Sequence, residues 1–348
     1  MNIIKKFCFL AVMCLVFAAC EEKKFGDGVK LKDIELSGSS LRVNLGETDR
    51  MYAFPIPYDC TDYEFKWVSS DPGIVTVDAY GRVTARDIGT VTVTVSQGSI
   101  SKQFSVETYE VTLREKVDSL KVKGFWQFLD ANDLFKASVG TDLIPVGTGF
   151  EQIAGFNSRT KTIVIPCSQK VGDEWQYNHL IYNHNFGANG GSDKSVNEFT
   201  ILIDCKFPGD GGPSNPPWVN GKYYSLYQTD LYNNADASFF WRPGADWGLR
   251  GRYTNSNHLY VRDTWYRFII SVKLGQSIRY FLNGTNYPAA NNGELDNYNA
   301  WDVKSVLLFA DDDGEDGQGF PLHVANLAIW DKALTDDQIK YIGPLVLL

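Results

Sequence analysis

The stretch WYRFIISVKLGQSIRYFLNG, residues 265–284, contains the clearest folding signals in the chain. Residues 266–272 and 278–282 are short runs rich in β-branched and aromatic residues, a composition typical of β-strands. Asn283-Gly284 directly follows the second run, and this dipeptide favours a hairpin turn because both residues adopt positive φ angles at little cost. The stretch therefore predicts neighbouring strands with a hairpin turn after residue 282.

Comparable runs occur along the whole chain of 348 residues, of which 44% are hydrophobic and 14% aromatic. This length is typical of two domains, and the composition is sufficient to bury hydrophobic cores. The clearest helix signal is terminal, where Thr335 is an N-cap residue followed by Asp336 and Asp337. The sequence therefore predicts an all-β protein. The further predicted strands are residues 34–36, 41–45, 63–68, 74–78, 82–85, 89–95, 125–129, 161–166, 198–207, 223–228, 237–241, 249–253 and 306–309.

The N-terminal strands carry a recurring pattern of turn and core residues. They resemble the bacterial immunoglobulin-like group 2 module from about residue 31 to residue 106. The resemblance implies an Ig-like β-sandwich that acts as a spacer or adhesive stalk, with Trp67 in its core. The pattern consists of Trp67-x-Ser69-Ser70-Asp71, Ile74-x-x-Val77-Asp78, Gly81-x-Val83-Thr84-Ala85 and residues 89–95.

The C-terminal part carries a second pattern, which includes Asp263-x-Trp265-Tyr266-Arg267, Tyr280-x-x-Asn283-Gly284, residues 307–310 and residues 324–339. These segments resemble laminin-G-like domains of the concanavalin A-like lectin/glucanase type. The resemblance implies a C-terminal concanavalin A-like (jelly-roll) β-sandwich, with Trp126, Trp265 and Trp330 in its core. Loops as long as residues 209–221 are larger than a spacer needs, and they suggest a function in the second domain.

Residues 1–19 have the pattern of a signal peptide, because Lys5 and Lys6 precede an apolar run that ends in Ala18-Ala19-Cys20. The run is too short to span a bilayer. Its end resembles the lipobox of bacterial lipoproteins, in which the cysteine is diacylated; an ordinary secretory signal with a chance cysteine is the alternative. Since two acyl chains give stable anchoring, we expect a lipid anchor at Cys20 in the outer membrane.

Glu21 and Glu22 follow the cysteine and resemble the surface-export signal of Bacteroidetes lipoproteins. This resemblance implies exposure on the cell surface, and without it the protein would face the periplasm. The predicted organisation is a signal peptide (1–19), a tether (20–30), the Ig-like domain (31–109), a charged linker with a possible short helix (110–123) and the laminin-G/concanavalin A-like domain (124–348).

Three cysteines remain beyond the anchor: Cys60, Cys167 and Cys205. Cys167 and Cys205 could form a disulfide, or all three could be small buried hydrophobic residues. The sequence contains no CxxC or HExxH motif, so a structural zinc site is not expected. The formal net charge of −9 without a basic run also argues against binding to nucleic acid.

Hydrolases of the concanavalin A-like fold carry a strand with the pattern Glu-x-Asp-x-x-Glu, since two carboxylates must flank the scissile bond. This chain lacks the pattern: residues 294–299 begin correctly but end in Asn299. We therefore expect a protein without catalytic residues. A glycoside hydrolase or lyase that uses an atypical pair, such as Asp230 with Asp246, remains the catalytic alternative.

Two groups of residues are candidates for binding a polysaccharide or oligosaccharide. The first is an asparagine- and histidine-rich segment whose amides and imidazoles suit hydroxyl groups, or whose asparagines bind only their own backbone. The second is an aromatic region with charged residues, in which Trp241 and Trp247 bracket a turn and are expected at the surface. The residues are Asn178, His179, His184, Asn185 and Asn189, and then Asp230, Trp241, Arg242, Trp247, Arg250 and Arg252.

An acidic run near the C-terminus could hold a metal ion. Its carboxylates repel one another unless solvent or a cation relieves them, and oxygen ligands favour Ca²⁺. The alternatives are a structural Ca²⁺ site and a solvated acidic turn. The residues of this run are Asp311, Asp312, Asp313, Glu315 and Asp316.

These expectations combine into one functional hypothesis, a lipid-anchored surface protein that binds a carbohydrate through its second domain. The alternatives are a protein-binding adhesin or envelope component, and the hydrolase or lyase described above.

Overall fold

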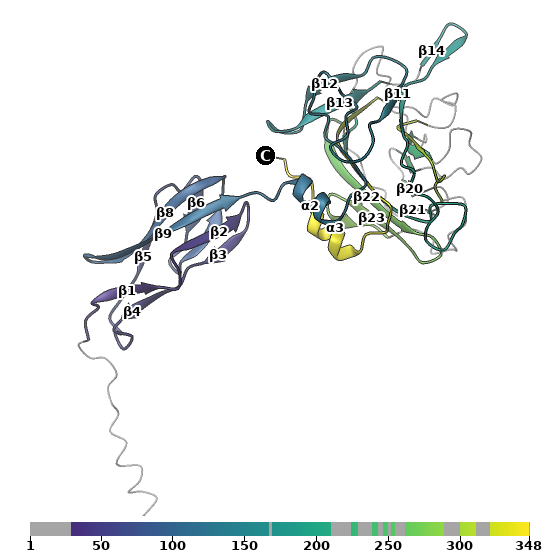
Figure 1. Ribbon diagram of the computed structural model, residues 1–348. Helices are drawn as coiled ribbons and strands as arrows, with labels where there is room; N and C mark the ends of the chain where they lie inside the picture. Colours follow the sequence, from purple (N-terminus) through teal and green to yellow (C-terminus); the bar gives the residue numbers. More distant parts are fainter. Residues whose placement is uncertain are drawn as a thin grey trace, which may run out of the picture. The chain divides into compact units, whose positions relative to one another are not determined.

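The computed structural model describes residues 29–166, 169–209, 224–228, 239–242, 246–249, 252–254, 262–288, 300–310 and 321–347. The chain divides into two compact units, Met1–Thr112 and Leu113–Leu348 (Figure 1). Both units are built from β-sheets, which confirms the predicted all-β class. The predicted signal peptide and Cys20 lie outside the described residues. No helix in the described part is long and apolar enough to cross a membrane.

The first unit is a sandwich of short strands around a valine-rich core. A four-stranded sheet has the order β2-β9-β8-β5, a three-stranded sheet has the order β3-β7-β6, and β1 pairs with β4. The predicted core residue Trp67 packs against this core, edge-on to Phe104 at 6.2 Å. The strands are β1 (Asp33–Leu36), β2 (Ser40–Asn44), β3 (Thr48–Arg50), β4 (Ala53–Ile56), β5 (Lys66–Ser69), β6 (Val75–Val77), β7 (Arg82–Ala85), β8 (Gly89–Gln97) and β9 (Ile100–Tyr109).

Gly81 shows why the motif of this unit contains a glycine. Its φ angle is +75°, and an added Cβ would lie 2.4 Å from the carbonyl oxygen of Met51 and 2.8 Å from the Trp67 ring. Only glycine combines the positive φ with the absence of a side chain. The turn before β7 therefore depends on Gly81, and it lets Trp67 close one side of the core.

The second unit is a sandwich of two large antiparallel sheets. One sheet has the order β12-β13-β26-β17-β22-β23-β24, with β10 also paired to β26, and the other has the order β11-β16-β25-β18-β19-β20-β21. The strands are β10 (Gly124–Trp126), β11 (Ile144–Val146), β12 (Glu151–Ala154), β13 (Lys161–Ile165), the separate β14 (Gln169–Val171) and β15 (Glu174–Gln176), β16 (His179–Tyr182), β17 (Glu198–Lys206), β18 (Tyr224–Gln228), β19 (Phe239–Trp241), β20 (Trp247–Leu249), β21 (Arg252–Tyr253), β22 (Trp265–Lys273), β23 (Ser277–Leu282), β24 (Thr285–Asn286), β25 (Val306–Leu308) and β26 (Leu322–Trp330).

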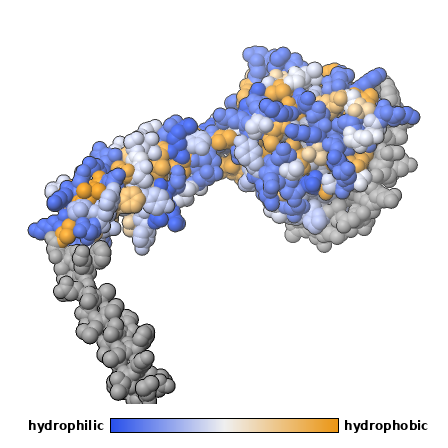
Figure 2. Space-filling model, turned by 60° about the horizontal axis from the view of Figure 1, so that its bottom comes forward, coloured by the Kyte–Doolittle hydropathy of each residue, from blue (hydrophilic) through white to orange (hydrophobic). Residues whose placement is uncertain are grey.

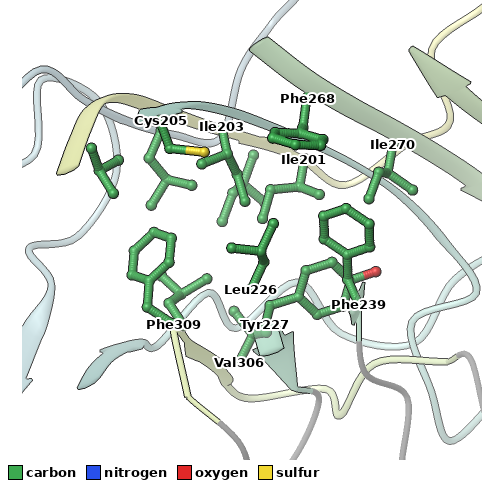
Figure 3. Packing of buried hydrophobic residues seen from close by; sticks show 14 of the residues in the cluster. Ile201, Ile203, Cys205, Leu226, Tyr227, Phe239, Phe268, Ile270, Val306 and Phe309 are labelled. Atoms are coloured by element: carbon green, nitrogen blue, oxygen red, sulfur yellow. The ribbon is translucent and has the colours of Figure 1, made fainter. Parts of the chain in front are cut away.

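The core of this unit lies between the two sheets (Figure 3). Side chains alternate between the two faces of a strand, so Ile201 and Ile203 of β17 point into the core. They meet Leu226 and Phe239 from the opposite sheet. The Asn283-Gly284 turn joins β23 to β24, as the opening stretch predicted.

Two short helices cover the outer face of the eight-stranded sheet. Helix α2 (Leu113–Ser119) falls within the second unit and supplies the buried Val117, and helix α3 (Asp336–Ile342) supplies Ile339 and Ile342. These residues form a second core with outward-facing residues of the sheet. Helix α3 begins with a capping box in which Thr335 and Gln338 exchange hydrogen bonds, as its N-cap sequence predicted.

Polar residues on the helix-covered face of the eight-stranded sheet bind the C-terminal segment. The hydroxyl of Thr200 donates to the carbonyl oxygen of Lys332, and Ser271 donates to that of Leu334, both at 2.8 Å. Arg267 donates to the carbonyl oxygens of Gly343 and Pro344. These bonds explain how polar residues can be buried at a face covered by helices.

Candidate functional site

Since both described helices cover the eight-stranded sheet, the outer face of the seven-stranded sheet is the candidate site. Strand alternation and pairing identify its residues, because the intervening residues belong to the core between the sheets. The middle of this face is buried, whereas its two ends keep exposed groups. We call it the outer face; its residues are Ile144, Val146, His179, Ile181, Ser225, Gln228, Phe240, Arg242, Asp246, Gly248, Tyr253 and Leu307.

The accessible polar groups lie at the β19–β21 end of the outer face. Arg242 follows β19 and Asp246 precedes β20, and their side chains form a bidentate ion pair with both N–O distances at 2.5 Å. The Arg242 guanidinium also lies over the ring of Tyr253, 5.0 Å from its centroid. The side chains of Arg242 and Asp246 are 23% and 21% exposed. This end therefore presents a fixed, uncharged combination of a guanidinium, a carboxylate and an aromatic ring.

The prediction that Trp241 and Trp247 are surface residues is wrong, because both side chains are fully buried. The two residues are directly paired across β19 and β20, so they share a face of the sheet, and this face is the core. Trp241 stacks on Phe207 at 3.7 Å, and Trp247 lies edge-on to Phe268 at 5.2 Å. The alternation that buries the tryptophans places Arg242 and Asp246 on the outer face.

The described asparagines of the asparagine-rich segment form hydrogen bonds to backbone groups, most of which belong to other parts of the chain. The Asn189 amide donates to the carbonyl oxygens of Glu198 and Asp331 and accepts from two backbone N–H groups. Buried Asn178 accepts a hydrogen bond from the backbone N–H of Thr148 at 2.9 Å. Exposed Asn185 has a positive φ of 50° and donates to the carbonyl oxygen of Asn183. These bonds favour the structural alternative for this segment.

His184 and His179 belong to the same segment but differ in burial. His184 is 8% exposed, its ring is tilted against that of Phe186 with the centroids 4.5 Å apart, and its Nδ1 accepts a hydrogen bond from the Phe186 backbone N–H. His179 is half-buried on the outer face. Burial lowers the pKa of each imidazole to about 4, so both side chains are neutral at pH 7.

The stability of the second unit is expected to fall as the pH decreases from 7 to 5. The folded pKa of His184 is about 4, below its ordinary value of 6.5, so the unfolded chain binds the proton first. The stability that His184 contributes is therefore complete above about pH 6.5 and is lost progressively toward pH 4, by on the order of 2 kcal/mol at pH 5. His179 and His323, whose pKa values are also lowered to about 4 by burial, add to the loss. His184→Asn keeps an acceptor for the Phe186 N–H but does not titrate. Urea denaturation at both pH values should show a smaller loss in this variant, and an equal loss would contradict the assignment.

Several predicted residues cannot be placed at the site. Asp230, Arg250 and the predicted calcium ligands Asp311, Asp312, Asp313, Glu315 and Asp316 lie outside the described residues, as does Cys167. Arg252 belongs to β21. The described cysteines, Cys60 and Cys205, are buried free thiols, and burial raises the pKa of the Cys205 thiol. Among the residues that the structure describes, no group of three or more His, Cys, Asp or Glu side chains could hold a metal ion.

Sequence reasoning did not select Tyr253 as a binding residue, and it did not place the buried Phe240 and Gln228 on the outer face. The period-two alternation through residues 239–242 could have separated Phe240 and Arg242 from the core residues. It could not have shown that Tyr253 lies beside Arg242, because that contact depends on the pairing of three strands.

Comparison with known proteins finds similarity over parts of the chain. An uncharacterised protein of Clostridium acetobutylicum is 37% identical over 100 residues, which are 26% of this chain and 25% of that protein. The binding domain of Paraclostridial Mosquitocidal Protein 1 has 15% identity and a TM-score of 0.41, covering 63% of this chain and 50% of that chain. The botulinum neurotoxin serotype D binding domain has 14% identity and a TM-score of 0.41, covering 64% and 54%.

The chain thus spans about a quarter of the curated relative and about half of the toxin domain chains. A GH10 xylanase from termite gut that contains a bacterial Ig-like domain has 22% identity and a TM-score of 0.17, covering 20% of this chain and 18% of that chain. The family model of the bacterial Ig-like domain (group 2) matches residues 31–108, and the first unit is a domain of this kind.

Proposed function

We propose that this protein binds a carbohydrate, without catalysing a reaction on it, at the β19–β21 end of the outer face. The observation that supports this proposal is the partly exposed arrangement of Arg242, Asp246 and Tyr253. An aromatic ring can contact the apolar C–H face of a sugar, while guanidinium and carboxylate groups bond its hydroxyls. Because Arg242 and Asp246 neutralise each other, a neutral or weakly charged saccharide fits this end best.

The geometry also favours binding over hydrolysis at this position. A retaining glycosidase needs two free carboxyl groups about 5–5.5 Å apart, and an inverting enzyme needs about 6.5–9.5 Å. Asp246 is instead bound on both oxygens by Arg242. The anchor at Cys20 and the surface location remain predictions, and they are consistent with a protein that captures polymers outside the cell.

Replacing Arg242 by lysine is expected to weaken carbohydrate binding about tenfold. Lysine keeps the charge but loses the planar fork that binds two oxygens at once. Binding of residues 21–348 can be measured on a glycan array and then quantified by calorimetry with the best glycan. Arg279→Lys is the matched control, because the Arg279–Asp336 pair at 2.6 Å lies on the eight-stranded sheet. Equal affinity of both variants, or no glycan bound at all, would refute the proposal.

A further inference from the structure

The first unit exposes an unusual set of aromatic side chains. Tyr52, Phe54, Tyr58 and Tyr80 are 52%, 43%, 69% and 74% exposed. Tyr52 and Phe54 lie two positions apart, and the residues on either side, Met51 and Pro55, are buried. Alternation therefore directs Tyr52 and Phe54 to the same outward face of β4 and the residue before it. A domain that serves only as a spacer has no need for such a face.

Contacts and strand pairing link the residues of this surface. Arg50 lies over the Tyr52 ring at 5.4 Å and donates to the backbone carbonyl oxygen of Tyr80 at 3.0 Å. Across the β1–β4 pair, Glu35 is directly opposite Phe54, and the Tyr58 hydroxyl donates to the Glu35 carboxylate. We call this surface the aromatic band; its residues are Tyr80, Arg50, Tyr52, Phe54, Glu35 and Tyr58.

An open groove adjoins the aromatic band at Glu35. Its volume is about 470 Å³, and its polar lining includes Asp33, Glu35, Lys102 and Gln103. Lys102 and Asp33 form an ion pair at 3.1 Å. The apolar side chain of Ile56 also lines the groove and is paired with Asp33 on the exposed face of the β1–β4 ribbon. The groove therefore offers donors and acceptors beside the aromatic rings.

The size and charge of this surface indicate its ligand class. The groove falls within the range of about 300–1,000 Å³ that is typical of small-ligand sites. Its charges balance, since Asp33 is paired with Lys102 and the band contains one arginine and one glutamate. Figure 2 shows hydrophobic residues scattered among hydrophilic ones on one face of the molecule.

We propose that the aromatic band and the groove bind a neutral polysaccharide chain, so that the Ig-like unit is a second glycan-binding module. Outward positions two residues apart on an extended chain are about 6.8 Å apart, so Tyr52 and Phe54 present neighbouring rings on one face. The exposed ring faces would contact sugar C–H groups, and Glu35, Lys102 and Gln103 would bond hydroxyls. This inference uses only residues of the first unit, so it does not depend on the function proposed for the second.

The test is affinity electrophoresis of residues 21–348 in gels that contain mixed-linkage β-glucan or xylan. The double variant Tyr52→Ala/Phe54→Ala is expected to bind about tenfold more weakly, since it removes two ring contacts. Tyr63→Ala is the matched control, because Tyr63 is an exposed tyrosine of the same unit that contacts Phe65. Thermal melting of each variant checks that the replacements at exposed positions leave the fold intact.

The outcomes separate this inference from the proposal for the second unit. Retardation that is reduced by Tyr52→Ala/Phe54→Ala and kept by Tyr63→Ala supports the aromatic band, whatever Arg242→Lys does. Wild-type retardation in the double variant overturns the inference and leaves the proposal for the outer face to its own test. Failure of the wild type to bind either polymer also overturns it. Self-association in sedimentation velocity that the double variant abolishes would assign the band to contact between two copies, and would overturn it as well.

Discussion

Asp204→Asn is expected to destabilise the second unit by about 3–5 kcal/mol, because it leaves the Arg267 charge buried without its counterion. Asp204 is fully buried and the Arg267 side chain is 6% exposed. Two hydrogen bonds of 2.7 Å join them, and Asn326 donates to the same carboxylate at 2.8 Å. Chemical denaturation, followed through tryptophan fluorescence, measures the change in the free energy of unfolding.

An exposed ion pair of the same unit supplies the control for this prediction. Lys136 and Asp142 lie 3.1 Å apart, but their side chains are 59% and 47% exposed. Lys136→Ala is therefore expected to cost only about 0–1 kcal/mol. Replacing both buried partners, as Asp204→Leu with Arg267→Met, should cost less than the sum of the single changes, since no charge is then left alone. A loss from Asp204→Asn no larger than that from Lys136→Ala would contradict the assignment.

Trp247→Ala is expected to destabilise the second unit by about 3–5 kcal/mol, the usual cost of deleting a buried aromatic side chain. The Trp247 ring is fully buried against aromatic residues of the opposite sheet, with Phe268 at 5.2 Å and Tyr280 at 5.4 Å. Its removal leaves a cavity that the surrounding strands fill only in part. The measurement is the unfolding free energy in urea, with Trp247→Phe expected to lose less.

The comparison with Tyr253→Ala separates a core role from a ligand-binding role. Tyr253 is half-buried on the outer face beside Arg242, so its truncation should lower glycan affinity with little loss of stability. Trp247→Ala should instead cause a large loss of stability. If Trp247→Ala left the unfolding free energy unchanged and abolished glycan binding, the tryptophan would be a ligand contact and its placement in the core would be wrong.

Much of the architecture could be predicted from local sequence because strands and caps depend on near neighbours. The runs at residues 82–85 and 278–282 and the Asn283-Gly284 turn all form as predicted. The capping box at Thr335 is likewise local. Residues 100–109, which form β9, were not among the predicted strands. Their pairing with both β2 and β8 is a long-range property that propensity does not report.

The candidate site was less predictable, because residue type does not reveal direction. Tryptophan beside a glycine-containing turn suits a sugar platform and a core equally well. The pairing of Trp241 with Trp247 places both side chains on the core face of the sheet. Similarly, Asn189 has the chemistry of a ligand-binding amide. In the structure, however, its side chain forms four hydrogen bonds to backbone groups of residues 197, 198 and 331.

The sequence by itself determined the all-β class and the Ig-like character of residues 31–108, and it identified Arg242 as a candidate binding residue. These features follow from period-two patterns, turn residues and motifs, which act over a few residues. Only the tertiary structure decided which face each side chain takes. It buried Trp247, paired Asp204 with Arg267 beneath the C-terminal segment, and aligned Tyr52 with Phe54 at the surface of the first unit. The physical reason is that burial and pairing depend on contacts between strands that are distant in sequence, which the propensities of single residues do not report.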